Sequence, residues 1–242
     1  MQTRWKNKMP IENRLQLWSY YGSKCKLIKY YPKPKYDTII EPFAGSAWYS
    51  LQYPNHKIIL CEKYKVIYDI WNWLINEATV DEILQYSNLY LGQDVSKLPI
   101  RKEHKYLLGF CINRGSSAPK NIVQKWSCQV KSKPNWASTT YFSLQRIIEY
   151  LPKIKHWKII LDDYQKLNNI EATWFIDPPY QQGGQHYIEH DLNYDNLANF
   201  CKTRRGQVIV CENLNAMWLP FKPLVEFHGQ SHNNTEAIWT NE

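Results

Sequence analysis

The 242-residue sequence contains no apolar run that approaches the roughly 18–20 residues of a membrane-spanning helix. Hydrophobic residues still make up 44% of the chain, with 11 Trp and 18 Tyr, a composition typical of a globular protein and not of a disordered one. The first residues, Met1-Gln2-Thr3-Arg4-Trp5-Lys6, lack the apolar stretch of a signal peptide. We therefore expect no membrane partner and a cytoplasmic location, in a bacterium or a phage-infected host cell.

Closely spaced cysteine pairs are also absent. The six cysteines are widely separated and form no Cys-x-x-Cys motif, so we expect no metal site. Cys61 and Cys211 lie in apolar runs typical of strands, and we interpret them as reduced core residues. No internal repeat or low-complexity linker divides the chain, and its length suits one domain, over residues 1–242.

Acidic residues are scarce in two segments. Residues 1–36 contain nine Lys or Arg and one acid, a net charge of +8, and residues 101–134 contain eight and one, a net charge of +7. Such concentration suits binding to a phosphate backbone, although solvated lysine faces would give the same pattern. The second segment also contains residue types that can reach base edges or fill the gap left by an extruded base: Asn113, Arg114, Ser116, Ser117 and Trp126.

The most informative motif is Asp177-Pro178-Pro179-Tyr180, which directly follows the apolar run Trp174-Phe175-Ile176, a predicted buried strand. Two prolines make a rigid turn whose carbonyls remain free to accept hydrogen bonds. The exocyclic amine of adenine is a poor nucleophile because its lone pair is delocalised into the ring. The Asp177 carboxylate and the Pro178 carbonyl, each accepting one N–H, can localise that lone pair toward a methyl donor, while the Tyr180 ring stacks on the base. A plain strand-ending turn is the alternative interpretation.

A second motif follows the β-branched run 37–40, in the sequence Glu41-Pro42-Phe43-Ala44-Gly45-Ser46-Ala47. A strand, a turn of small residues and a helix form the nucleotide-binding unit of open α/β sheets. The next predicted strand ends at Glu62, and an acid about 20 residues beyond such a turn is placed to bind ribose hydroxyls. One glycine is a weak signal by itself, and a solvated acid at a strand end is the alternative for Glu62.

With these motifs, the chain resembles the Dam-like family of DNA adenine-N6 methyltransferases over roughly residues 20–180. Tyr20-Tyr21-Gly22-Ser23-Lys24 is similar to the N-terminal motif of that family, Phe43-Ala44-Gly45-Ser46-Ala47 to its cofactor loop, and Asp163-Tyr164 to its Asp-Phe step. Three departures stand out. Ala47 replaces the last glycine of the cofactor loop, Ser23 replaces a glycine of the first motif, and Glu62-Lys63-Tyr64 stands where the family usually has Asp-x-Asn.

The resemblance implies a single catalytic domain with a Rossmann-like methyltransferase fold, which uses S-adenosylmethionine and methylates adenine in double-stranded DNA. It implies a monomer or weak dimer, and roles in restriction-modification or in phages. The implied catalytic residues are Asp177, Pro178, Pro179 and Tyr180. The implied cofactor-binding residues are Tyr20, Lys24, Phe43, Ala44, Gly45, Ser46, Glu62, Asp163, Tyr164 and Asp177, with Lys24 reaching the cofactor carboxylate and Asp163 its adenine amine. Cytosine-N4 methylation, RNA adenine methylation and a catalytically silent nucleic-acid-binding relative are the alternatives.

Hydrophobic periodicity predicts an α/β protein with a mostly parallel sheet and a C-terminal antiparallel hairpin. We expect parallel strands at 37–40, 57–61, 157–161, 173–176 and 207–211, and hairpin strands at 224–228 and 236–240. We expect helices at 12–30, 46–53, 64–77, 80–91, 102–110, 139–150 and 194–203. Residues 80–150 are predicted to be an inserted target-recognition segment, small, basic and irregular over 92–138. In the loop 181–192, His186 and Tyr187 form either a lid or a plain surface loop.

Overall fold

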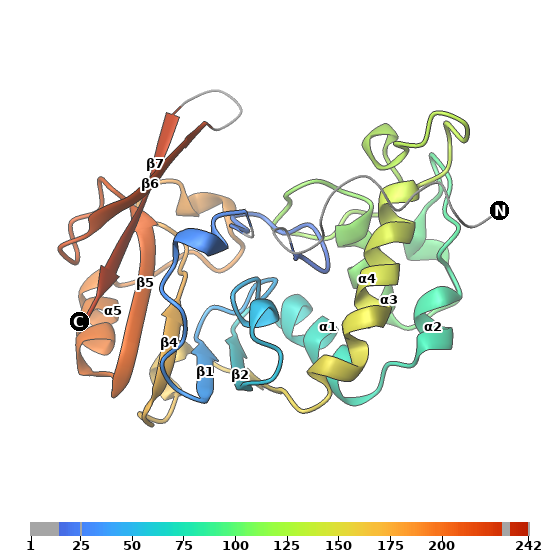
Figure 1. Ribbon diagram of the computed structural model, residues 1–242. Coiled ribbons are helices and arrows are strands. Elements are labelled where there is room, and N and C mark those ends of the chain that lie inside the picture. Colours follow the sequence, from blue (N-terminus) through green and yellow to red (C-terminus); the bar gives the residue numbers. More distant parts are fainter. Residues whose placement is uncertain (1–14, 25, 229–232, 242) are drawn as a thin grey trace.

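The computed structural model describes residues 15–24, 26–228 and 233–241. Within them, seven strands form one sheet in the order β3-β2-β1-β4-β5-β7-β6 (Figure 1). The strands are β1 Thr38–Glu41, β2 Lys57–Glu62, β3 Lys158–Leu161, β4 Ala172–Ile176, β5 Gly206–Asn213, β6 Lys222–His228 and β7 Asn233–Thr240. Strands β1 to β5 pair in parallel, and β7 pairs antiparallel with both β5 and β6. The predicted Rossmann-like sheet with a C-terminal hairpin is therefore confirmed.

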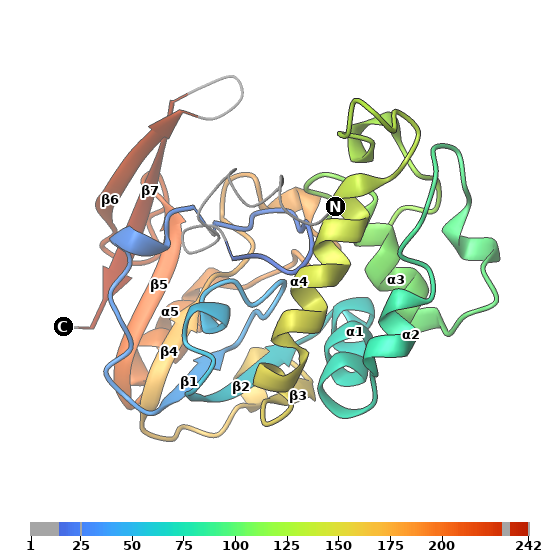
Figure 2. The same cartoon turned by 45° about the vertical axis from the view of Figure 1, so that its right-hand side comes forward.

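Helices cover the sheet unequally on its two faces. They are α1 Lys65–Asn76, α2 Val80–Leu84, α3 Lys102–Cys111, α4 Ser138–Ile154 and α5 Tyr194–Thr203. Because side chains alternate along a strand, Ile39 of β1 joins the core with α1, α3 and α4, whereas Ile40 joins the smaller core under α5. Figure 2 shows α1 to α4 grouped beside β2 and β3, away from the hairpin.

The predicted insert, residues 80–150, does not form a core of its own. Ile83 of α2, Leu107 of α3 and Leu144 of α4 belong to the same buried cluster as the sheet residue Ile58. The predicted short helix near 102–110 is present as α3, and two isolated bridges, Tyr90 with Trp136 and Asp94 with Ile122, tie the irregular connections together. A role of this segment in target recognition stays a prediction.

Two helices predicted near the N-terminus are not found in the described residues, so these predictions are wrong. Residues 12–14 and Cys25 of the predicted helix 12–30 lie outside the described part. The rest contains only a short 3-10 helix at Ile28–Tyr30, because Gly22 has a φ of +74° and tertiary hydrogen bonds replace helical ones. For residues 46–53 the structure has turns and a 3-10 helix at Ser50–Gln52, since Ala47 has a left-handed φ of +47°.

The remaining differences concern element ends. Helix α2 ends at Leu84, where the sequence predicted a helix to residue 91, and α4 continues to Ile154. Cys61 and Cys211 are buried free thiols on β2 and β5, as predicted. No helix among the described residues has both the length and the apolar character needed to cross a membrane.

Candidate active site

A cleft lies at the carboxyl ends of β1, β2, β3 and β4, where the strand order reverses between β1 and β4. This switch point is where open α/β sheets bind their ligands. The cleft has about 830 Å³ of empty space, part of it open to solvent. The residues that the sequence assigned to the cofactor and that line the cleft are Tyr20, Phe43, Ala44, Gly45, Ser46, Glu62, Asp163, Tyr164 and Asp177. Sequence positions far apart thus meet in one site.

The turn after β1 is held by backbone and side-chain hydrogen bonds. Gly45 has a φ of +47°, and a Cβ there would lie 3.1 Å from the Tyr20 ring. The Gly45 N–H donates to Glu62 Oε2 at 2.9 Å, and the Trp71 indole N–H donates to the Gly45 carbonyl at 2.9 Å. Ala47, which replaces a family glycine, keeps a left-handed backbone at φ +47°. The turn therefore keeps a glycine-like conformation despite the substitution.

Both carboxylate oxygens of Glu62 accept backbone hydrogen bonds, one from this turn and one from the start of the segment after β2. Oε2 accepts from Gly45 and Oε1 accepts from the Tyr64 N–H at 2.9 Å. Burial raises the pKa of Glu62, against the lowering effect of these hydrogen bonds. Each oxygen has a second lone pair, so Glu62 can still accept from a ribose hydroxyl while it holds the turn.

Two aromatic rings and an acid also line the cleft. The rings of Phe43 and Tyr164 have centroids 5.3 Å apart, and both line the cleft. Asp163 Oδ1 accepts from the Gln165 N–H at 3.0 Å, and its other oxygen lies 3.7 Å from Lys63 Nζ. These side chains give the cleft aromatic ring surface and a carboxylate acceptor.

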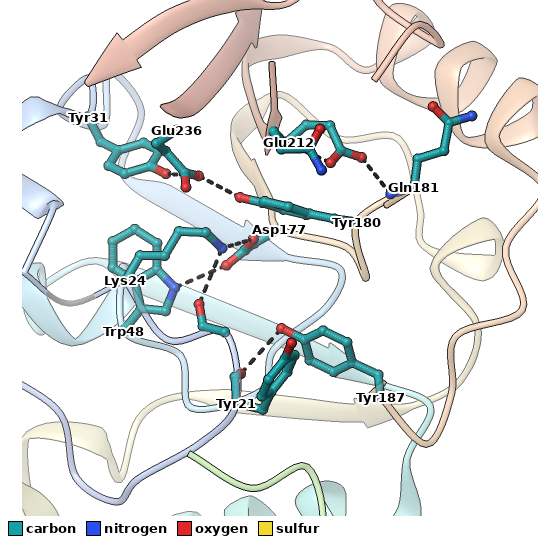
Figure 3. A network of polar contacts seen from close by, with 12 residues as sticks. Tyr21, Lys24, Tyr31, Trp48, Asp177, Tyr180, Gln181, Tyr187, Glu212 and Glu236 are labelled. Atoms are coloured by element: carbon teal, nitrogen blue, oxygen red, sulfur yellow. Dashed lines mark hydrogen bonds and ion pairs between the residues drawn. The ribbon is translucent and has the colours of Figure 1, made fainter. Parts of the chain in front are cut away.

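Asp177 follows β4 directly and is held by two donors (Figure 3). Lys24 Nζ lies 2.6 Å from Oδ1, with the two side chains 11% and 14% exposed, and the Trp48 indole N–H donates to Oδ2 at 3.2 Å. Burial by itself lowers the pKa of Lys24, but the negative charges of Asp177 and Glu236 outweigh burial and raise it well above its ordinary value. Lys24, expected at the cofactor carboxylate, is thus a protonated partner of Asp177.

The rest of the motif is fixed by hydrogen bonds. The Pro179 carbonyl accepts from the Tyr194 hydroxyl at 3.0 Å, and Pro178 is buried. The Tyr180 hydroxyl donates to Glu236 Oε1, and Lys24 Nζ lies 4.5 Å from the centroid of the Tyr180 ring. Burial, followed by the charge of Asp177, raises the pKa of Tyr180 well above its ordinary value, so the hydroxyl keeps its proton.

The loop 181–192 closes the cleft from the side of the N-terminal segment. The Tyr187 hydroxyl donates to the Tyr21 carbonyl at 3.3 Å, and the two rings have centroids 5.1 Å apart. A Cβ on Gly22 would lie 1.8 Å from the Tyr187 hydroxyl oxygen, so this contact requires glycine. His186 lies against Tyr21, with centroids 5.6 Å apart. These contacts join the loop to the N-terminal segment beside the cleft, and its role as a lid stays a prediction.

The lining of the cleft is strongly acidic. Its acidic residues are Glu41, Glu62, Asp162, Asp163, Asp177, Glu189 and Asp191, and among the lining residues Lys63 alone is Lys or Arg. Burial raises the pKa of Glu41 from 4.5 to about 8, so this carboxyl is largely neutral at pH 7. The other carboxyls give a cleft that favours a cationic ligand and repels phosphates.

Sequence reasoning missed Trp48 and Glu236. Trp48 directly follows the cofactor loop and could have been suspected from its position. Glu236 lies on β7 between Thr235 and Ala237, and a single acid in a strand of mixed polarity gives no pattern that identifies a partner.

No protein-family model and no curated protein sequence matches the chain. Among solved structures, a conserved hypothetical protein from Streptococcus pyogenes is similar at 10% identity, over 85% of this chain and 86% of that one, with a TM-score of 0.36. The Escherichia coli protein "Putative methyltransferase yhhF" is similar at 10% identity, over 83% of this chain and 74% of that one, with a TM-score of 0.32. At this degree of similarity, neither structure bears on activity.

Proposed function

We propose that this protein is an S-adenosylmethionine-dependent methyltransferase that modifies the exocyclic amine of adenine in DNA. The observation that carries the proposal is the position of Asp177, which faces the same cleft as the glycine turn after β1. A carboxylate for the amine and a nucleoside-binding turn thus share one cavity, as transfer between two bound molecules requires.

The charge of the cleft supports this choice of cofactor. S-adenosylmethionine carries a sulfonium, an ammonium and a carboxylate, a net positive charge that suits the acidic lining, whereas cofactors with phosphates would be repelled. Glu62 would hold the ribose, and Phe43, Asp163 and Tyr164 the adenine. When bound, this cofactor supplies an electrophilic methyl group.

Asp177 would accept a hydrogen bond from the target amine and so raise the electron density on its nitrogen. The Trp48 indole already orients one oxygen of the carboxylate, so this bond can persist when the amine arrives. A carboxylate offers about four lone-pair sites, so it can accept from the amine and from Trp48 together. Tyr180 would stack on the base, and because Lys24 lies over its ring, a base on that face must displace the ammonium.

The distribution of basic residues supports a nucleic-acid substrate. Arg101 pairs with Glu77 and Glu103, and Lys102 pairs with Asp69, so these two charges are neutralised within the protein. In contrast, no acidic side chain in the described ranges forms an ion pair with the exposed basic residues Arg114, Lys120, Lys125, Lys131 and Lys133. The charge of these residues is therefore not offset by an acid, and phosphates could bind them.

The loop that carries Arg114 lies beside the cleft. The Gly115 N–H donates to Ser19 Oγ at 2.6 Å, and the Tyr21 N–H donates to the Ser116 carbonyl at 3.2 Å. Since Tyr21 lines the cleft, these bonds connect the basic segment to its mouth. A duplex held by that segment would lie within reach of Asp177.

The variant Asp177→Ala tests the function. It should abolish methyl transfer to adenine but leave S-adenosylmethionine affinity within about tenfold, because Asp177 acts on the amine and contributes little to cofactor binding. Transfer of a labelled methyl group to DNA and calorimetric titration with the cofactor measure the two properties. Asp195→Ala, an exposed acid in the first turn of α5, is the matched control and should keep both. Transfer by Asp177→Ala at the wild-type rate would contradict the assignment.

A further inference from the structure

Glu236 is a buried acid that the proposed reaction leaves without a role. It is 3% exposed and lies on β7, opposite Asn213 of β5. Its Oε1 accepts from two hydroxyls, those of Tyr31 at 2.6 Å and of Tyr180. Burying a carboxylate is costly unless it is hydrogen-bonded, and a well-packed apolar residue often stabilises a core at least as well. Stability alone therefore does not explain an acid at this position.

One of the two hydroxyls is on a ring with a fixed position. Tyr31 is 4% exposed, and its ring packs edge-on against Trp48 and Phe175, with centroids 5.3 and 5.6 Å away. Glu236 is thus held on one side by a ring locked in the core and along its backbone by the pairing of β7 with β5. The remaining contact of Oε1, with Tyr180, connects this fixed group to the Asp177 motif (Figure 3).

Glu236 also belongs to the charge balance around Asp177. The Lys24 ammonium contacts Asp177, and the charge of Glu236 acts on the same ammonium. Burial raises the pKa of Glu236, while Lys24 and the two tyrosine hydroxyls oppose that shift. One cation therefore interacts with the charges of two carboxyls, and it lies over the ring of Tyr180.

We infer that Glu236 is a positioning residue that holds the Tyr180 ring, through its hydroxyl, at the orientation in which the ring receives the target base. This inference rests on the proposed function. A tyrosine without this bond could tilt about its side-chain torsions, and misplacement by about 1 Å in an active site can cost about 100-fold in rate. The sequence assigned a role only to the ring of Tyr180, which stacks on the base, whereas the structure gives its hydroxyl a buried acceptor.

The inference predicts coupled effects on turnover. Glu236→Gln removes the charge of the acceptor and should lower kcat for adenine methylation by about tenfold, the effect of losing one charged hydrogen bond. Tyr180→Phe removes the donor and should also cost about tenfold. Because both changes act on the same contact, one by weakening the acceptor and one by removing the donor, the double variant should be no slower than the slower single variant. Effects that multiply to about 100-fold would overturn the inference.

Cofactor affinity separates positioning from a general structural defect. In Glu236→Gln the Kd for S-adenosylmethionine should stay within about twofold of wild type, since Glu236 does not line the cleft. A loss of cofactor binding in parallel with kcat would overturn the inference. Should Glu236→Gln not fold, Tyr31→Phe removes the other hydroxyl at Oε1 and should lower kcat in the same direction, by a smaller factor.

A measurement on Tyr180 itself does not depend on activity. In protein labelled with ¹³C-tyrosine, the Tyr180 ring signal is assigned by its absence in Tyr180→Phe, and it should shift and broaden in Glu236→Gln. An unchanged signal would overturn the inference. Wild-type protein that methylates no adenine would overturn the proposed function and leave this result standing. Glu226→Gln, an exposed acid on β6 of the same hairpin, is the matched control and should leave the signal unchanged.

Discussion

Asp177 is oriented by two donors of different kinds. Lys24 provides charge at 2.6 Å, while Trp48 provides a neutral N–H at 3.2 Å from an indole packed at a right angle against Phe175. The indole is 3% exposed and cannot move far, so it fixes one oxygen, whereas the lysine side chain is flexible. The carboxylate can therefore keep its orientation while Lys24 yields space to a base.

Lys24→Met should destabilise the protein by leaving the Asp177 carboxylate without its cation. Breaking a fully buried pair costs about 3–5 kcal/mol, and the residual exposure of this pair reduces the expected loss to about 2–3 kcal/mol. The double variant Lys24→Met with Asp177→Asn removes both charges and should recover most of that loss. Urea denaturation at pH 8 measures the free energy of unfolding of each variant.

The control for this comparison is Lys29→Met, because Lys29 is exposed and contacts only the Tyr30 ring among the described residues, at 4.7 Å. It should change stability by less than about 0.5 kcal/mol. If Lys24→Met costs no more than Lys29→Met, the pair with Asp177 contributes nothing to the fold.

At the scale of elements, hydrophobic periodicity correctly predicted the helices whose apolar side chains pack against the sheet. Helix α1 was predicted almost to the residue because Ile67, Ile70 and Leu74 recur at helical spacing and are all buried. The helix predicted for the N-terminal segment was wrong because the conformation there depends on distant partners, such as the Ser116 carbonyl that accepts from the Tyr21 N–H. No local pattern contains that information.

The same difference between local patterns and distant contacts applies to the candidate site. Asp177 and Gly45 could be found because their chemistry is local to a strand end and a turn. Glu236 could not, because its partners Tyr180 and Tyr31 lie 56 and 205 residues away in sequence. The pairing of Lys24 with Asp177, across 153 residues, likewise appears only when the sheet brings the two segments together.

Gly22→Ala should weaken cofactor binding by displacing the loop 181–192. A left-handed backbone costs a non-glycine residue about 1–2 kcal/mol, and the added Cβ would also lie 1.8 Å from the Tyr187 hydroxyl oxygen. Tyr187 must then move, and the cleft-lining residues that follow it, Ile188 and Glu189, move with it. Calorimetric titration with S-adenosylmethionine should show a lower affinity, and urea denaturation a lower stability.

Gly92→Ala separates these two effects. Gly92 has a φ of +81°, and nothing lies within 4 Å of a Cβ placed there, so only the backbone cost applies. The free energy of unfolding of Gly92→Ala should fall by about 1–2 kcal/mol, while its cofactor affinity stays unchanged. Equal cofactor affinities for the two variants would show that Tyr187 does not close the cleft.

At the scale of the whole molecule, opposite charges occupy different places. The cleft is acidic, while unpaired basic residues lie on the connection between α3 and α4, which Figure 2 shows on the same side of the molecule as the carboxyl ends of the strands. In the basic segment 1–36, residues 1–14 lie outside the described part, and the exposed residues Lys26, Lys29 and Lys33 add positive charge to the surface. Under the proposed function, a phosphate backbone would approach the rim while the cleft admits a cation.

DNA affinity should therefore fall steeply with salt, and part of that dependence should come from three exposed lysines of the insert. Replacing Lys120, Lys125 and Lys131 by Ala should reduce the slope of log K against log salt by up to about three units, roughly one for each lost phosphate contact. Fluorescence anisotropy with a labelled duplex between 50 and 200 mM salt, the range over which about 10³–10⁵ in affinity is lost for 6–10 contacts, measures the slope.

The matched variant replaces Lys57, Lys158 and Lys202, which are exposed at the starts of β2 and β3 and in the last turn of α5. It removes the same charge from positions away from the cleft and should leave the slope within about one unit of wild type, because nonspecific charge acts weakly beyond a Debye length of about 10 Å. If both triple variants change the slope equally, net charge and not the insert governs binding, and the duplex is held elsewhere.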